Sequence, residues 1–313
     1  MWTPLVTAAV MLAGAQSSAL LPPDCVRAVP AGTHNGHMVI TAGHKPGLWL
    51  ASARGKVERR LTRGHDGEAS FSPDGRKIVF QRFTRQHRWA IVTRGVSGGR
   101  TRTIFTSAPG EDSATAPVWS PDGRSIAFLS STGGEEGYQT QVVMIRPNGT
   151  RAREVHRVSD LTNIPTLAQS RNGRCFAYQW GNFDKGALAI RNPDFSEGVN
   201  LIPFNAVMPD GAEIFVPESA AFGANGRRLY VTYPVTVNGK DAGDRIYAIA
   251  MDDEMTPPKA VVDQAGYPLP SPDGRSLAYL SLDDAWTHVR KLSGAPRDRR
   301  LLKGIVWDWA PAR

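Results

Sequence analysis

Cysteine and long apolar segments are scarce in this sequence of 313 residues. Its only cysteines are Cys25 and Cys175, so at most one disulfide can form within the chain. After residue 19, no apolar run reaches the length of about 20 residues that a membrane-spanning helix needs. The sequence also lacks a P-loop, a dinucleotide-binding motif and a stripe of basic and aromatic residues. We therefore expect no cofactor, no nucleic-acid partner and no membrane span once the start of the chain is removed.

The start of the chain has the composition of a secretory leader. Residues 1–19 carry no charged side chain, and an apolar run over residues 5–15 is followed by small residues suited to cleavage. We interpret residues 1–19 as a signal peptide and residues 20–30 as an approach segment. Because no Lys or Arg precedes Leu5, an uncleaved membrane anchor and a wrongly assigned start codon remain alternatives. The expected location is secreted, periplasmic or in the cell envelope.

A turn of the type Ser-Pro-Asp-Gly recurs along the chain. Residues 119–128 read Trp-Ser-Pro-Asp-Gly-Arg-Ser-Ile-Ala-Phe, which predicts two strands joined by a tight hairpin. Proline presets φ, aspartate or asparagine bonds its own backbone, and glycine adopts a positive φ. Further copies begin at Ser72, Ser170, Gly223 and Ser271, with a weaker one at Thr33. The turn residues are Asp74, Gly75, Asp122, Gly123, Asn172, Gly173, Asn225, Gly226, Asp273 and Gly274.

The spacing of these copies predicts a β-propeller. They begin 39 to 53 residues apart, which is typical of blades built from short strands. We predict an all-β fold over residues 31–313, a six-bladed propeller of four-stranded antiparallel blades with all these turns on one face. The first repeat lacks a good inner strand, whereas residues 304–309 form a strand that no hairpin follows. The C-terminal strand is therefore predicted to complete the first blade and close the ring.

The repeated pattern also resembles a known family. Aromatic-Ser-Pro-Asp-Gly-Arg-x-aliphatic-Ala-Phe/Tyr is similar to the propeller repeat of TolB-like proteins, over roughly residues 30–313. The resemblance implies a propeller that binds partners in the cell envelope and performs no catalysis. TolB itself has an α/β domain before its propeller, whereas this chain passes from leader to first repeat within about a dozen residues. We therefore infer from the resemblance only the propeller fold, and we do not infer a role in the Tol–Pal system.

Two expectations follow from the ring. The aromatic residues before the turns, Phe71, Trp119 and Phe222, should wedge between neighbouring blades. Cys175 falls on a strand of a mid-chain repeat and Cys25 precedes the first repeat, so they are expected to lie too far apart to bond. A disulfide between them remains the alternative, since it would suit an exported protein.

Polar residues of the inner strands are predicted to line the central channel. Side chains alternate along a strand, so positions two and four before each turn should point away from the blade interfaces. The polar members of this set are Glu68, Ser70, Thr166, Ser219, Tyr267 and Asp308. Only Glu68 and Asp308 are carboxylates, and they belong to neighbouring blades. We expect a mildly acidic channel that binds a partner segment, without catalytic residues and without a metal.

Two short motifs resemble functional signatures but have simpler explanations. Residues 95–99 match Gly-x-Ser-x-Gly, which in hydrolases links a strand to a helix. Here the motif falls between two predicted strands, so we interpret it as a turn. His34, His37 and His44 lack the spacing of a metal site and are expected to be solvated loop residues.

The net charge and the absence of catalytic or cofactor-binding motifs leave two classes of function. The net charge of +8 is spread over turns and would attract anionic envelope polymers. The first class is a monomeric interaction scaffold that binds a protein or peptide, with an anionic envelope polymer as a further partner. The second class is a propeller enzyme, or a protein that binds a small molecule or glycan in its channel. The family resemblance and the absence of a catalytic constellation favour the scaffold.

Overall fold

The computed structural model describes most of the chain from residue 34 onward. The described residues are 34–43, 45–109, 113–134, 137–158, 166–181, 186–251 and 256–312. The predicted signal peptide and approach segment lie outside them, as do Cys25 and His44. The division of the chain into leader, approach segment and propeller therefore stays a prediction.

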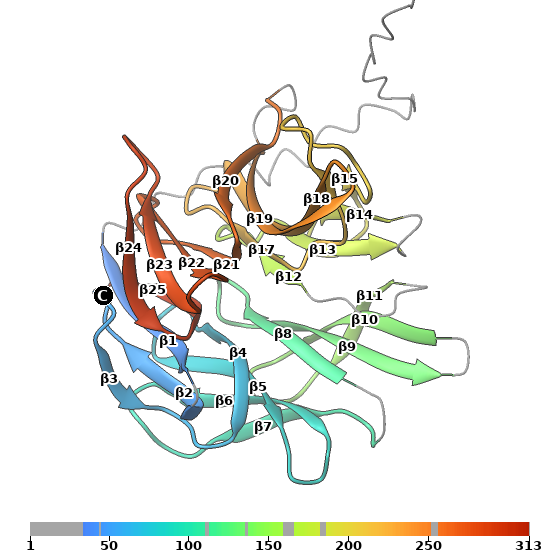
Figure 1. Cartoon of the computed structure of the whole chain (residues 1–313). Helices are drawn as coiled ribbons and strands as arrows, with labels where there is room; N and C mark the ends of the chain where they lie inside the picture. The colour runs from blue at the N-terminus through green and yellow to red at the C-terminus, as the bar shows by residue number, and fades with distance from the viewer. Residues whose placement is uncertain are drawn as a thin grey trace, which may run out of the picture.

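Six antiparallel sheets follow one another around a ring (Figure 1), which confirms the predicted six-bladed propeller. Within the described residues there are strands and turns but no helix, and hence no helix that could cross a bilayer. Blade 1 consists of β25 (Ile305–Pro311), β1 (Asn35–Ala42), β2 (Lys45–Ala51) and β3 (Val57–Arg60). Blade 2 consists of β4 (His65–Phe71), β5 (Lys77–Phe83), β6 (Trp89–Gly95) and β7 (Arg102–Thr106). Blade 3 consists of β8 (Ser113–Trp119), β9 (Ile126–Gly134), β10 (Gly137–Ile145) and β11 (Arg153–Val158).

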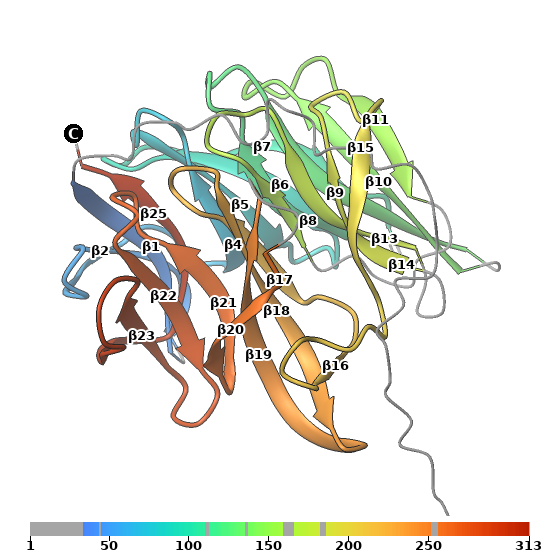
Figure 2. The ribbon, with the colours of Figure 1, turned by 90° about the horizontal axis from the view of Figure 1, so that it is seen from above.

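The second half of the ring repeats this plan, with one extended blade. Blade 4 consists of β12 (Leu167–Gln169), β13 (Phe176–Gly181), β14 (Gly186–Arg191) and β15 (Gly198–Pro203). Blade 5 consists of β16 (Glu213–Ile214), β17 (Ser219–Phe222), β18 (Arg228–Val237), β19 (Lys240–Ala250) and β20 (Lys259–Asp263). Blade 6 consists of β21 (Ala265–Pro270), β22 (Ser276–Ser281), β23 (Trp286–Lys291) and β24 (Asp298–Lys303). Both β16 and β17 pair with the long strand β18, and the β18–β19 hairpin projects from the ring (Figure 2).

The five turns at Ser72, Ser120, Ser170, Gly223 and Ser271 share one geometry. Their glycines have φ between 60° and 72°, and each glycine N–H donates to the carbonyl of the first turn residue at 2.7–2.9 Å. In the four turns that begin with serine, the hydroxyl donates to the Asp or Asn side chain at 2.6 Å. Each turn links the inner strand of a blade to its second strand, so all five lie on one face.

The weak copy at Thr33 is not such a turn. Asn35 and Gly36 already lie in β1, with Asn35 opposite Pro311 of β25. A Cβ at Gly36 would lie 2.5 Å from the Pro311 carbonyl oxygen, so the glycine permits this close pairing. A hairpin has no role here because the inner strand of blade 1 comes from the opposite end of the chain.

The C-terminal strand closes the ring, as predicted. β25 pairs antiparallel with β1, with Val306 opposite Ile40 and Trp309 opposite Met38. Blade 1 therefore joins the two ends of the described chain, and its inner edge is not left open to solvent.

The buried core is divided among the six blade junctions. Each of six clusters contains residues from two neighbouring blades. Phe71 lies at the junction of blades 1 and 2, Trp119 at that of blades 2 and 3, and Phe222 at that of blades 4 and 5. Their exposed fractions are 7%, 8% and 7%, so these aromatics wedge between blades as expected.

The expectation for the cysteines was wrong. Cys175 is fully buried in blade 4 and takes part in a disulfide. The only other cysteine in the sequence, Cys25, lies outside the described residues. The expectation assumed that the residues before the first repeat stay close to blade 1. This assumption was not justified, because the repeat spacing says nothing about where those residues lie.

Candidate functional site

Residues with a positive φ mark equivalent positions on three inner strands. Glu68, Ala116 and Tyr267 each lie four positions before a turn, and their φ angles are 41°, 49° and 54°. The pairing of the inner strand with its neighbour changes register at each of these positions. Residues with a side chain rarely adopt this conformation, and a bulge of this kind redirects the side chain. The strict alternation used to predict the channel lining therefore fails at this position in blades 2, 3 and 6.

Side chains of the inner strands join neighbouring blades. At four junctions, a side-chain oxygen accepts a hydrogen bond from a backbone N–H of the next blade. These bonds run from Ala116 to Glu68 Oε2 (2.5 Å), from Ala220 to Thr166 Oγ1 (3.0 Å), from Tyr267 to Ser219 Oγ (3.2 Å) and from Phe71 to Asp308 Oδ2 (2.7 Å). Four of the six residues predicted for the channel thus bond the blades to one another.

The other two predicted residues lie beside this set. Ser70 hydrogen-bonds to the Asp308 carboxylate. The Tyr267 side chain is 41% exposed, and its ring meets that of Trp307 edge-on, with centroids 5.7 Å apart. The fold therefore brings the predicted residues together on the inner strands, and their part in binding a partner stays a proposal.

Withdrawal from solvent raises the pKa of both inner-strand carboxyls, Glu68 and Asp308. Hydrogen bonds from backbone N–H groups offset part of this rise. An acid whose pKa is higher in the folded state binds more protons there than in the unfolded chain. Its contribution to stability is therefore complete below the unfolded pKa and is lost as the pH rises through the folded pKa.

Replacing Glu68 with glutamine should remove this pH dependence while keeping an oxygen that can accept from Ala116. We expect the wild type to lose stability relative to Glu68→Gln as the pH rises above about 4, the ordinary pKa of glutamate. Urea unfolding at a series of pH values between about 2.5 and 8 measures the difference, because a raised pKa changes the profile above about 4 and a lowered pKa changes it below about 4. The matched control is Asp122→Asn, because Ser120 lowers the pKa of Asp122 and the sign should reverse. Parallel pH profiles for wild type and Glu68→Gln would contradict the argument.

Two carboxyl groups that the sequence analysis did not single out lie where the inner strand of blade 5 begins. Glu218 directly precedes β17 and Asp244 lies on β19, and the two carboxyls are close enough for one, when protonated, to donate a hydrogen bond to the other. We call them the carboxyl pair. Desolvation raises the pKa of both, and the charge of Asp244 raises that of Glu218 further. Such a pair shares a proton and ionises in two coupled steps.

The carboxyl pair lies near Tyr267, whose backbone N–H donates to the hydroxyl of Ser219, the residue after Glu218. Desolvation raises the pKa of the Tyr267 hydroxyl, and the charges of Glu218, Glu68 and Asp244 raise it further. These groups therefore share one electrostatic environment at the face of the ring opposite the turns. Glu218 stands five positions before its turn and Asp244 lies on the third strand of its blade, so the alternation rule could select neither.

The structure describes the Gly-x-Ser-x-Gly motif and two of the three histidines. Residues 95–99 form a turn between β6 and β7, in which the Gly98 N–H donates to the Gly95 carbonyl at 3.2 Å. His34 is exposed, as expected for a loop residue. His37 is not in a loop: it lies on β1 and pairs with Glu58 at 3.1 Å. Within the described ranges, no three His, Cys, Asp or Glu side chains are arranged to hold a metal ion.

Comparison with curated proteins gives a distant relative. No known protein-family model matches the chain. Dipeptidyl-peptidase 5 from Porphyromonas endodontalis is 26% identical over 235 residues, which cover 72% of this chain. The chain spans only 30% of the length of that relative.

Solved structures with this fold match over most of the chain. TolB from Acinetobacter baumannii superposes with a TM-score of 0.66 and 16% identity, over 91% of this chain and 68% of that one. A chain of the nidogen/laminin complex gives a TM-score of 0.65 and 13% identity, over 88% of this chain and 97% of that one. Identities this low establish the fold alone. The chain therefore has the six-bladed propeller fold of TolB-like proteins.

Proposed function

We propose that this protein is an exported TolB-like propeller that acts as a non-enzymatic scaffold and binds a basic segment of a protein partner. The observation that carries the proposal is the carboxyl pair beside the half-exposed Tyr267. Two carboxyls held against each other are harder to ionise than carboxyls in water. A lysine or arginine side chain placed between them would stabilise the doubly ionised state, which favours a cationic ligand.

The surroundings of the carboxyl pair suit a peptide segment. Tyr267 and Trp307 offer two aromatic rings in edge-to-face contact, and aromatic side chains are enriched at protein interfaces. The β18–β19 hairpin, which carries Asp244, projects from the ring (Figure 2). The same fold occurs in a complex between two proteins, nidogen and laminin, which supports a protein partner in general terms.

The composition of residues 1–19 and the likeness to TolB support a location in the periplasm, the envelope or outside the cell. A propeller enzyme, or a protein that binds a small molecule in the channel, is the second candidate. The resemblance to dipeptidyl-peptidase 5 supports it, although the chain covers less than a third of that protein. Peptidase activity of the purified protein that disappears in a carboxyl-pair variant would favour this candidate over the scaffold.

A photo-cross-linking experiment tests the scaffold. With p-benzoylphenylalanine in place of Tyr267, the protein should cross-link to a partner from an envelope extract, because this side chain is 41% exposed beside the carboxyl pair. The matched control carries the same probe at Val57, which is 42% exposed on the outer strand β3. Mass spectrometry of the adduct should place the cross-link in a segment rich in Lys or Arg.

The carboxyl pair supplies the second part of this test. Adding Glu218→Gln and Asp244→Asn should reduce the yield of the Tyr267 adduct, whereas Asp241→Asn on the same hairpin should not. Equal cross-linking from positions 267 and 57, or an undiminished yield in the double variant, would refute the proposed site.

A further inference from the structure

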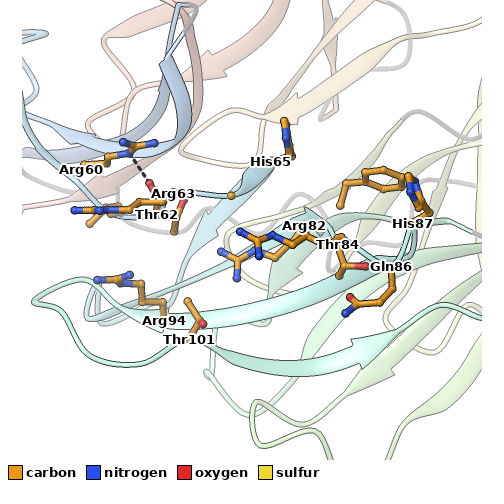
Figure 3. A pocket seen from close by; sticks show the side chains of 14 residues that line it. Arg60, Thr62, Arg63, His65, Arg82, Thr84, Gln86, His87, Arg94 and Thr101 are labelled. Atoms are coloured by element: carbon orange, nitrogen blue, oxygen red, sulfur yellow. Dashed lines mark hydrogen bonds between the residues drawn. The ribbon is translucent and has the colours of Figure 1, made fainter.

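A pocket of about 930 Å³ opens between blades 1 and 2, and its lining does not include the carboxyl pair (Figure 3). The segment between β3 and β4, the hairpin between β5 and β6, and residues Arg94 and Thr101 form its wall. Its lining contains no Asp or Glu, but it includes five arginines: Arg60, Arg63, Arg82, Arg85 and Arg94. These residues are spread over 35 positions of the sequence, and the fold places them around one hollow.

Among the described residues, a carboxylate neutralises one of the five guanidinium groups. Arg82 forms a two-pronged ion pair with Asp66, at 2.6 and 2.9 Å, and the Asp66 side chain is fully buried. Gly64 makes room for this pair, since a Cβ there would lie 2.9 Å from the Asp66 carboxylate. Arg60 donates to the carbonyls of Thr62 and Pro46 at 2.9 and 2.7 Å. These bonds fix the orientation of the Arg60 guanidinium but do not neutralise its charge.

The remaining three arginines leave donors available in the pocket. Arg63 and Arg85 are exposed, and neither forms a hydrogen bond or ion pair with a described residue. The Nε of Arg94 is buried and has no hydrogen-bond partner. Four positive charges that no described carboxylate neutralises would concentrate anions in this one hollow.

We propose that this pocket binds a small ligand that carries two or more oxyanion groups, such as phosphates or carboxylates. Guanidinium groups present paired N–H donors that match the oxygens of both groups. The volume lies in the range of small-molecule sites, about 300 to 1,000 Å³, and is large enough for more than one such group. The site is separate from the proposed partner surface, so either proposal can fail without the other.

Calorimetric titration with inorganic tripolyphosphate tests the site. We expect saturable binding that weakens as NaCl is raised, because the interaction is electrostatic. The double variant Arg63→Gln, Arg94→Gln should weaken the affinity by at least about tenfold, the effect of losing one charge-assisted hydrogen bond. Arg297→Gln removes the same kind of charge from an exposed loop of blade 6 and should leave the affinity unchanged. Tripolyphosphate should also raise the melting temperature of the wild type more than that of the double variant.

Two further binding experiments identify the source of the anionic group. Citrate tests carboxylates in place of phosphates, and vesicles that contain 30% phosphatidylglycerol test a membrane surface. Binding of tripolyphosphate or citrate that depends on Arg63 and Arg94 supports the proposal. It is overturned if neither compound binds at millimolar concentration, if the double variant and Arg297→Gln behave alike, or if only the vesicles bind.

Discussion

A chain that ends at residue 303 is expected not to fold into a stable ring. The deletion removes β25, which is the inner strand of blade 1 and pairs along β1. It also removes Val306 and Trp309, which are 5% and 4% exposed in the core between blades 6 and 1. Asp308 is lost with them, and with it the bond to the Phe71 N–H in blade 2. One strand thus serves three blades, so its loss should abolish cooperative unfolding of the whole ring.

Thermal unfolding followed by circular dichroism measures this effect. The matched control ends at Pro311, which keeps β25 and removes only the last two residues. We expect the control to melt like the full chain, whereas the chain ending at residue 303 should be insoluble or lack a cooperative transition. If both shortened chains melt at the temperature of the full protein, the ring is not held by β25.

The parts of the fold that local chemistry determines could be predicted from the sequence. The turn at Ser120 needs only Pro121, Asp122 and Gly123 in order, and the structure gives Gly123 a φ of 68°. The ring closure was predictable because an inner strand was missing at one end of the sequence and present at the other. The turn predicted at Thr33 failed for the same reason, since no hairpin connects strands from opposite ends of the chain.

The candidate site could be predicted only in part. The inner strands were assigned correctly, so Glu68 and Asp308 were placed in neighbouring blades as the structure has them. The bulge at Glu68 could not be predicted, because its positive φ is adopted by a residue with a side chain and no glycine marks the position. The carboxyl pair depends on the extra length of β18 and β19, which the repeat spacing does not reveal. Arginines that look dispersed along the chain meet in one pocket only after blades 1 and 2 have packed together.

Replacing Trp119 with alanine is expected to lower the free energy of unfolding by about 3–5 kcal/mol. The indole is 8% exposed and belongs to the core cluster at the junction of blades 2 and 3, which also contains Val79, Ile91 and Phe128. Its Nε1 is buried without a hydrogen-bond partner, so the substitution breaks no hydrogen bond of the ring and the loss comes from apolar contacts. The cavity would lie at a junction that both blades share, where neither can collapse to fill it without disturbing its own sheet.

The equivalent positions in other blades supply the control for this prediction. Phe71 and Phe222 occupy the same place before their turns and are buried to the same degree, 7% exposed each. Trp119→Phe should therefore keep most of the contact between blades 2 and 3 and cost clearly less than the alanine variant. Urea unfolding of both variants gives the comparison, provided that the free energy of unfolding falls with urea concentration at the same slope in each. A cost below about 1 kcal/mol for Trp119→Ala would fall in the range of surface substitutions, and it would mean that the ring does not depend on aromatic wedges between its blades.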